Sequence, residues 1–145
     1  MRHLTRLLAL LIAFGLFAPS ASALPQDHPR ALLSMLRGVD TIPTAEAIKA
    51  TTSTPEASLR KVADDEVLGQ YVRRRATSLL SLFPGKRSLE HLRTLRQSRS
   101  ERVAWVATYT LIRMQAKESG ERARRFAKDV LSQGGESQRE AAIRG

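Results

Sequence analysis

Two residue types are missing from this chain of 145 residues: it contains neither cysteine nor asparagine. Without cysteine the chain can form no disulfide, thiolate zinc site, thiol nucleophile or lipid-modified N-terminal cysteine. Without asparagine it offers no acceptor for an N-linked glycan. Its length fits one domain, and whatever fold that domain adopts is held together by noncovalent packing.

The first 23 residues have the pattern of a secretory signal peptide. Three basic residues (Arg2, His3 and Arg6) precede an apolar run over 7–17, and an A-x-A cleavage site ends at Ala23. An uncleaved anchor is the alternative, but the apolar stretch is shorter than the roughly 20 residues that a spanning helix needs. We therefore expect cleavage after Ala23 and export to the bacterial periplasm or the extracellular space.

Positive charge is concentrated in the second half of the chain. Residues 24–145 carry a net charge of +8, of which +7 falls within 85–145. Such a surface attracts phosphate, anionic lipid, acidic polysaccharide or acidic protein, and the alternative is a solvated helix face rich in arginine. The candidate basic patch consists of Lys86, Arg87, Arg93, Arg96, Arg99, Arg102, Arg122, Arg125 and Lys128.

Apolar residues recur at the helical period along most of the chain after residue 29, and no segment alternates as a strand would. The sequence predicts Asp64, Asp65 and Glu66 at the start of a helix that runs to Phe83. It also predicts capping boxes in which Ser98 and Ser137 begin helices. We expect helices over about 29–37, a short stretch after residue 43, 55–63, 64–83, 87–97, 98–116, 120–132 and from 137 onward.

The helices repeat. Apolar positions at 72, 76, 80 and 83 recur 31 residues later, at 103, 107, 111 and 114. A fixed period of helix pairs predicts a stack in which each pair buries its face against its neighbours, while an ordinary helical bundle with coincident spacings is the alternative. Apolar residues spread around nearly the whole helix at 100–116, which is typical of a helix buried on several sides.

The segment from Val72 to Leu80 resembles the second-helix pattern of short HEAT-like repeats of the phycobilisome-lyase type, V-R-x-x-A-x-x-A-L. Residues 138–143 are similar, with Gln138 in place of the valine, whereas 103–107 keeps Val and Ala but lacks Arg. The resemblance implies an all-α fold, a short right-handed α-solenoid of stacked antiparallel helix pairs with a period of about 31 residues. It also implies that the pattern's arginines pair with acidic groups of an adjacent repeat. The positions assigned to the pattern are Val72, Arg73, Ala76, Leu80, Phe83, Val103, Ala107, Leu111, Met114, Arg139 and Ala142.

We accordingly divide the chain into a signal peptide (1–23), an N-terminal helical lead-in or degenerate first repeat (24–53), and HEAT-like repeats (54–145) of which the last is incomplete. No metalloprotease, EF-hand or phosphate-loop motif occurs, so we predict no catalytic residue, metal or cofactor. His28 and His91 are expected at the surface. Tyr71, Trp105 and Tyr109 are expected to pack rather than to stack on nucleic-acid bases.

These features predict a non-enzymatic, exported helical-repeat protein that acts as a protein–protein interaction or scaffold module. The resemblance implies binding of macromolecules but no particular activity, because such repeats serve many functions. An envelope protein that binds an anionic polymer or a membrane surface through its basic second half is the alternative. An enzyme whose site the motifs do not reveal is a third hypothesis.

Overall fold

The computed structural model describes residues 27–145, and every regular element in that range is helical. The all-α class is therefore confirmed, while the predicted signal peptide lies outside the described residues. The helices are α1 (Arg30–Arg37), α2 (Ala45–Lys49), α3 (Pro55–Asp64), α4 (Gln70–Leu79) with a 3-10 extension η1 (Leu80–Leu82), α5 (Lys86–Leu95), α6 (Glu101–Glu118), α7 (Gly120–Gln133) and α8 (Glu136–Arg144).

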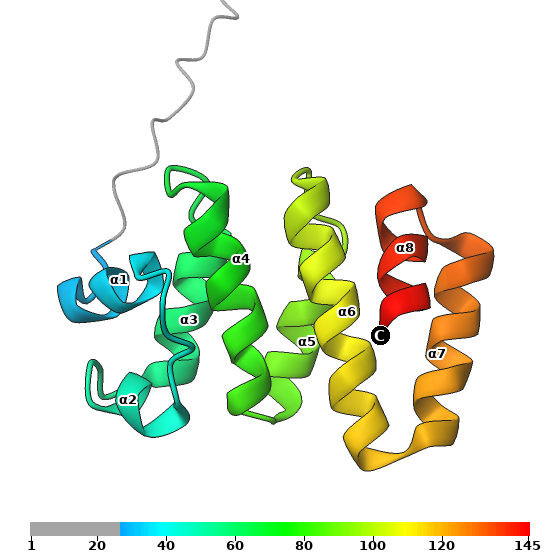
Figure 1. The fold of residues 1–145 in the computed structure, drawn as a ribbon, viewed down its shortest axis with the longest axis horizontal. Helices are drawn as coiled ribbons and strands as arrows, with labels where there is room; N and C mark the ends of the chain where they lie inside the picture. The colour runs from blue at the N-terminus through cyan, green and yellow to red at the C-terminus, as the bar shows by residue number, and fades with distance from the viewer. Residues whose placement is uncertain (1–26) are drawn as a thin grey trace, which may run out of the picture.

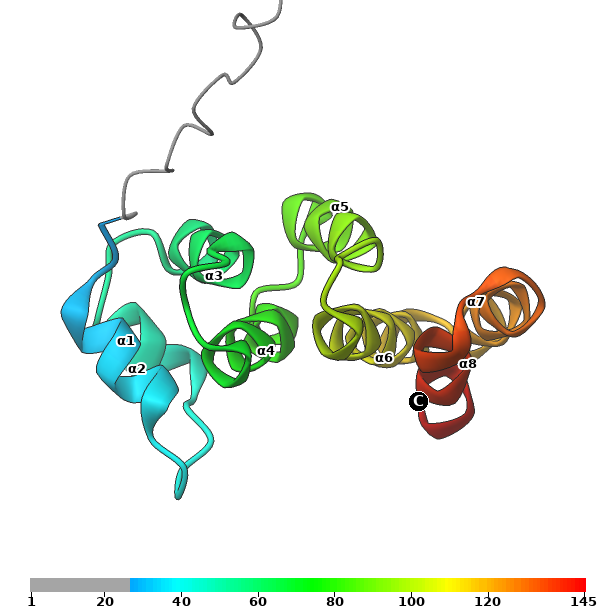
Figure 2. The ribbon, with the colours of Figure 1, turned by 90° about the horizontal axis from the view of Figure 1, so that it is seen from above.

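From α3 onward the helices lie in two layers. Figure 1 shows α4, α6 and α8 side by side, and the view from above in Figure 2 shows α3, α5 and α7 on the other side of them. Contacts follow the same order: α4 packs on α6 and α6 on α8, while α3, α5 and α7 pack on α4, α6 and α8 in turn. The short helices α1 and α2 cover the α3–α4 end.

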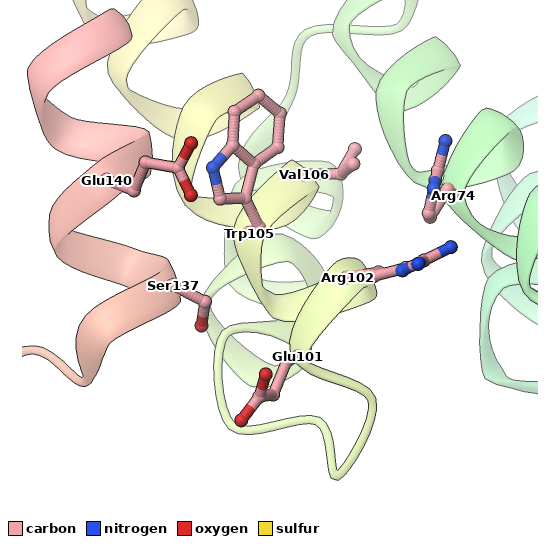
Figure 3. A pocket seen from close by; sticks show the side chains of 7 residues that line it. All are labelled: Arg74, Glu101, Arg102, Trp105, Val106, Ser137 and Glu140. Carbon is pink, nitrogen blue, oxygen red and sulfur yellow. The ribbon is translucent and has the colours of Figure 1, made fainter.

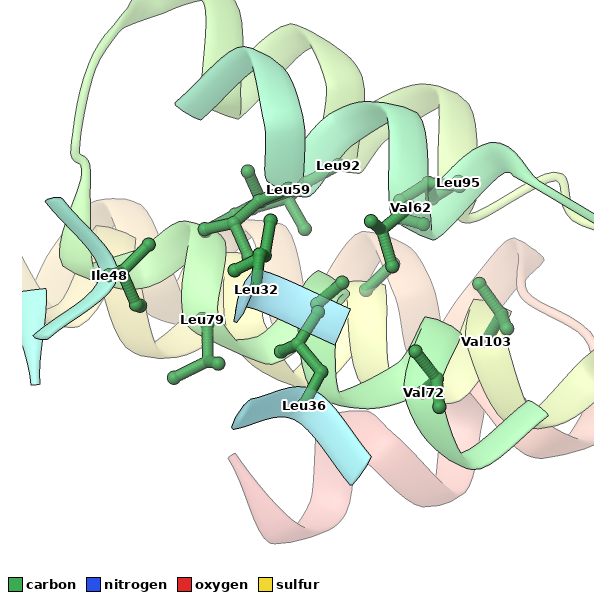
Figure 4. Close-up of a cluster of buried hydrophobic side chains, with 14 of the residues drawn as sticks. Leu32, Leu36, Ile48, Leu59, Val62, Val72, Leu79, Leu92, Leu95 and Val103 are labelled. Carbon is green, nitrogen blue, oxygen red and sulfur yellow. The ribbon is translucent and has the colours of Figure 1, made fainter. Parts of the chain in front are cut away.

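Leucine, valine and alanine fill the space between the layers (Figure 4). Leu59 of α3, Leu92 of α5 and Leu111 of α6 are completely buried, and each such side chain contributes about 1.5–3 kcal/mol of transfer free energy. The assigned apolar pattern positions of α4, η1 and α6 are buried, and Phe83, directly after η1, is half-buried. Ala142 of α8 is also half-buried.

Helix α6 lies at the centre of the packing. It contacts α4, α5, α7 and α8, so its buried residues occupy several sides, as its apolar circumference predicted. Trp105, Val106 and Tyr109 are only half-buried and form the side of α6 that no helix covers fully.

The prediction that Asp64 to Glu66 open a helix is wrong. Residue Asp65 instead caps the end of α3, and α4 begins at Gln70. The reason is a set of polar contacts that a local pattern does not contain. The Asp65 carboxylate accepts hydrogen bonds from the Val67 amide at 3.0 Å and from His28 Nε2 at 2.8 Å. His28 is therefore buried, against the expectation of a surface histidine.

Two predicted helix starts also shift. The N-cap of α6 is Ser100, whose hydroxyl accepts from the Val103 amide at 3.4 Å, whereas the Ser98 hydroxyl accepts from the Ser100 amide at 3.2 Å. Helix α8 begins at Glu136 with Gly135 as its N-cap, which places Ser137 inside the helix. Neither capping box forms as predicted: Ser100 caps α6 with its side chain, whereas no side chain caps the start of α8.

Arg73 and Arg139 occupy the arginine position of the HEAT-like pattern, which implies that they pair with acidic groups. Neither arginine does so among the described residues. Arg73 is buried, and its Nε donates to the main-chain carbonyl of Ala63 at 3.0 Å. It thereby satisfies a carbonyl at the end of α3, and it forms no ion pair among residues 27–145. Arg139 is exposed and forms no ion pair with a described residue.

Candidate functional site: a groove on the α4, α6 and α8 layer

The predicted basic patch is dispersed over the structure. All of its members except the half-buried Arg96 are exposed, but they lie on α5, on the turn before α6, on α6 itself and on α7. Helices α5 and α7 lie apart, as Figure 2 shows. Three members are also paired one helical turn away: Lys86 with Glu90 (3.9 Å), Arg122 with Glu118 (3.2 Å) and Arg125 with Glu121 (3.6 Å). The patch is thus several small basic areas, part of whose charge is compensated.

Arg96 has a structural environment. Its guanidinium lies 4.8 Å from the ring centroid of Phe126, and its main-chain carbonyl accepts from Gln138 Nε2 at 2.7 Å. Partial burial lowers the pKa of Arg96 below its ordinary value. This arginine therefore joins α5 to α7 and α8 and is not available to an anionic polymer in the way that Arg87 and Arg93 are.

A cavity of about 360 Å³ opens between α4, α6 and α8 (Figure 3). Arg102 extends from α6 toward Arg74 on α4, whereas Trp105 and Glu140 lie on the side of α8. Only Arg102 among these residues belongs to the predicted patch. The cavity is lined by Arg74, Glu101, Arg102, Trp105, Val106, Ser137 and Glu140.

Two neighbouring hollows continue this cavity along the same layer. One of about 260 Å³ shares Arg74 and Val106 with it and extends to Tyr71 and Ile42. The other, of about 210 Å³, lies between Ser78 of α4 and the α6 side chains that follow Trp105. We call this surface the groove face; it comprises Tyr71, Arg74 and Ser78 of α4, Arg102, Trp105, Val106, Tyr109 and Arg113 of α6, and Ser137 and Glu140 of α8.

Two aromatic side chains lie between two arginines along α6 on the groove face. The rings of Trp105 and Tyr109 stack with their centroids 5.2 Å apart and their planes 10° from parallel. The guanidinium of Arg113 lies 5.7 Å from the Tyr109 centroid and donates to the Tyr109 hydroxyl at 3.1 Å. These contacts hold Trp105 in a fixed orientation beside the cavity.

The arginines of α4 differ in how they are held. Arg75 donates to the carbonyls of Gly38 and Thr41 and to the Tyr71 hydroxyl, so it fixes the loop between α1 and α2. Arg74 and Arg102 form no ion pair with any described residue. The Nε of Arg74 is moreover buried with no hydrogen-bond acceptor within 27–145. The groove face therefore holds two guanidinium groups that form no ion pair among residues 27–145.

The sequence does contain a signal for the groove face, in the spacing of aromatic and arginine residues along α6. Arg102, Trp105, Tyr109 and Arg113 follow one another at helical spacings of three or four residues, which places them on one stripe of α6. Trp105 and Tyr109 do pack, as expected, but on each other and at the surface. Tyr71 contradicts the expectation, since it is 41% exposed.

Residues that could hold a metal ion do not gather in this part of the chain: within 27–145 no group of three or more histidine, aspartate or glutamate side chains converges. No helix of the same range is long and apolar enough to cross a membrane.

Comparisons with protein families, with curated proteins and with solved structures give no match for this chain.

Proposed function

We propose that this protein is an exported, non-enzymatic helical-repeat protein that binds another protein through the groove face. The observation that carries the proposal is the set of hollows along α4, α6 and α8, in which half-buried aromatic rings adjoin two guanidinium groups that have no ion-pair partner among residues 27–145. Recognition surfaces are enriched in tryptophan, tyrosine and arginine, because these residues combine a large contact area with few rotatable bonds or with directional hydrogen bonds.

Within this proposal the architecture is a short right-handed α-solenoid related to HEAT-like repeats. The spacing of helix starts supports it: α3 to α5 (55 to 86) and α4 to α6 (70 to 101) are both 31 residues. The next steps, α5 to α7 (86 to 120) and α6 to α8 (101 to 136), are 34 and 35 residues. Such a stack presents equivalent helices side by side, which is how solenoids build extended binding surfaces.

Export is the second element of the proposal, and it is carried by the N-terminal sequence pattern. Fractionation of the source cells followed by N-terminal sequencing tests it directly. A protein that begins at Leu24 in the periplasm or the medium supports export, and a cytoplasmic protein that begins at Met1 contradicts it.

The binding role is tested by capture of partners from an envelope or extracellular extract. We compare the wild-type protein with Trp105→Ala/Tyr109→Ala, which removes the stacked pair, and with Leu82→Ala, which shortens an exposed side chain away from it. A protein captured by the wild type and by Leu82→Ala, but lost from the double variant, supports the proposal. Equal capture by all three contradicts it.

Binding of an anionic polymer or a membrane surface through the basic second half is the other candidate function. Arg87, Arg93 and Lys128 favour it, because they are exposed and form no ion pair with a described residue. Salt separates the two candidates, since exposed charges are largely screened at about 0.5 M salt. Capture through the groove face persists under that condition, whereas capture by scattered surface charge is lost.

A further inference from the structure

We propose that the cavity between α4, α6 and α8 binds a carboxylate side chain of a partner peptide. This inference rests on the proposed function and names the chemistry of its ligand. In it, Arg74 and Arg102 hold the carboxylate from two neighbouring helices, and Trp105 with Val106 receives an apolar side chain next to the acidic residue.

The two arginines supply the anion-binding half of the site. Arg102 extends toward Arg74 across the cavity (Figure 3), and neither group has a carboxylate partner within 27–145. Two like charges that face one space are stabilised by an anion between them. A carboxylate matches a guanidinium through paired hydrogen bonds.

The apolar half of the site is fixed in advance. Trp105 is held by its stack on Tyr109, and Tyr109 is held in turn by Arg113. A ligand side chain that packs on Trp105 and Val106 therefore does not have to order a mobile ring, which lowers the entropic cost of binding.

Acidic side chains in the same cavity favour a peptide over a nucleic acid. Glu101 and Glu140 both line it, and Arg144 holds the carboxylate of Glu140 at 2.9 Å. A phosphodiester chain carries a negative charge at every nucleotide and would bring phosphates close to these carboxylates. A peptide carries its charge on one side chain, and its main-chain N–H groups can donate to Glu140 or to the Ser137 hydroxyl.

The chain provides its own reporter, because Trp105 is the single tryptophan and lines the cavity. We select binders to the purified protein from a library of random peptides and measure their affinities by the change in Trp105 fluorescence. We expect the selected sequences to carry an Asp or Glu beside an apolar residue. We also expect each peptide to lose at least about tenfold in affinity, or 1.4 kcal/mol, when its acidic residue is changed to the corresponding amide.

A matched pair of protein variants locates the contact. Arg74→Gln/Arg102→Gln lowers affinity at least about tenfold, whereas Arg87→Gln/Arg93→Gln, with the same loss of charge on exposed α5 residues, leaves it within about twofold. Circular dichroism confirms that both variants keep their helices. The peptide amides test the same contact without altering the protein, so the test does not depend on the folding of the groove variant.

Several results overturn the inference. The first two concern the library: no selected peptide is sensitive to Arg74→Gln/Arg102→Gln, or the selected sequences lack acidic residues. The third is an equal loss of peptide affinity in both double variants. The fourth is a single-stranded oligonucleotide that shifts Trp105 emission at lower concentration than the peptides. Failure of this inference is distinguishable from failure of the proposed function. A partner protein lost from Trp105→Ala/Tyr109→Ala but kept by Arg74→Gln/Arg102→Gln overturns the acidic ligand and leaves the groove face as the binding surface.

Discussion

His28 Nε2 lies 2.8 Å from Asp65 Oδ2, and this buried contact joins the segment before α1 to the turn between α3 and α4. Burial alone would raise the pKa of Asp65, but the hydrogen bonds from His28 and from the Val67 amide, together with the charges of His28 and Arg73, hold that pKa below its ordinary value. The ionised carboxylate is therefore the form that the fold stabilises.

The first prediction concerns this carboxylate. Asp65→Asn should lower the free energy of unfolding at pH 7 by about 1.5–3 kcal/mol, the usual value for a hydrogen bond to a charged group. Because the folded-state pKa is depressed, the contribution is present above the unfolded value of about 3.9 and is lost as the pH falls through the folded pKa. Urea unfolding between pH 7 and pH 3 should therefore show a shallower acid decline in Asp65→Asn than in the wild type.

Asp64 is the matched control for that measurement. Its carboxylate lies 3.2 Å from His91 Nε2, but its side chain is half exposed. Exposed ion pairs contribute at most about 1 kcal/mol, so Asp64→Asn should cost less than Asp65→Asn. Equal costs, or the same acid decline in wild type and Asp65→Asn, would contradict the assignment of Asp65.

The second prediction compares the two arginines of the repeat pattern. Arg73→Met removes the donor to the Ala63 carbonyl at the end of α3 while keeping an apolar stem, and should destabilise the protein by about 1–3 kcal/mol. Arg139→Met, at an exposed position, should change the free energy of unfolding by no more than about 0.5 kcal/mol. Thermal and urea unfolding measure both, and similar losses would show that Arg73 has no special structural role.

The third prediction tests the central position of α6. Leu111 is completely buried where α6 packs against its neighbours, so Leu111→Ala should cost about 2–5 kcal/mol. Ile143 of α8 is 76% exposed, and Ile143→Ala should cost no more than about 0.5 kcal/mol. Urea unfolding followed by circular dichroism distinguishes the two outcomes, and a tolerated Leu111→Ala would contradict the packing described.

The fourth prediction uses two adjacent glycines between α7 and α8. A Cβ atom added at Gly134 would lie 2.5 Å from the Val130 carbonyl oxygen, whereas one at Gly135 would meet nothing within 4 Å. Gly134→Ala should therefore destabilise the protein by about 1–3 kcal/mol, as steric overpacking does. Gly135→Ala should stay within about 0.5 kcal/mol of the wild type. The reverse order in a thermal melt would refute this account of the α7–α8 turn.

Local sequence patterns predicted most of the helices, because their apolar periodicity and their proline and glycine boundaries are local properties. They failed where a contact with a residue far away in the sequence determines the local structure. Asp65 looked like the start of a helix, but His28, 37 residues earlier, makes it part of a turn. A local pattern cannot show this pairing, because it depends on how α1 docks against α4.

The groove face was missed for a different reason. Apolar residues around nearly the whole circumference of a helix predict burial on several sides, but they do not show which stripe stays accessible. One stripe of α6 lies between α4 and α8, which leave it only partly covered. Trp105 and Tyr109 satisfy part of their apolar surface by stacking on each other. The sequence shows which residues are apolar, and only the spacing of the neighbouring helices shows which of them stay accessible.

The fifth prediction tests the central claim, that the groove face is where a partner binds. A photo-crosslinking amino acid placed at Val106, on the groove face, should form a covalent adduct with a protein from the envelope or extracellular extract. The same amino acid placed at Lys128, exposed on α7, should form little or none with that protein. Adducts of equal yield from both positions, or an adduct from position 128 alone, would contradict the proposed binding surface.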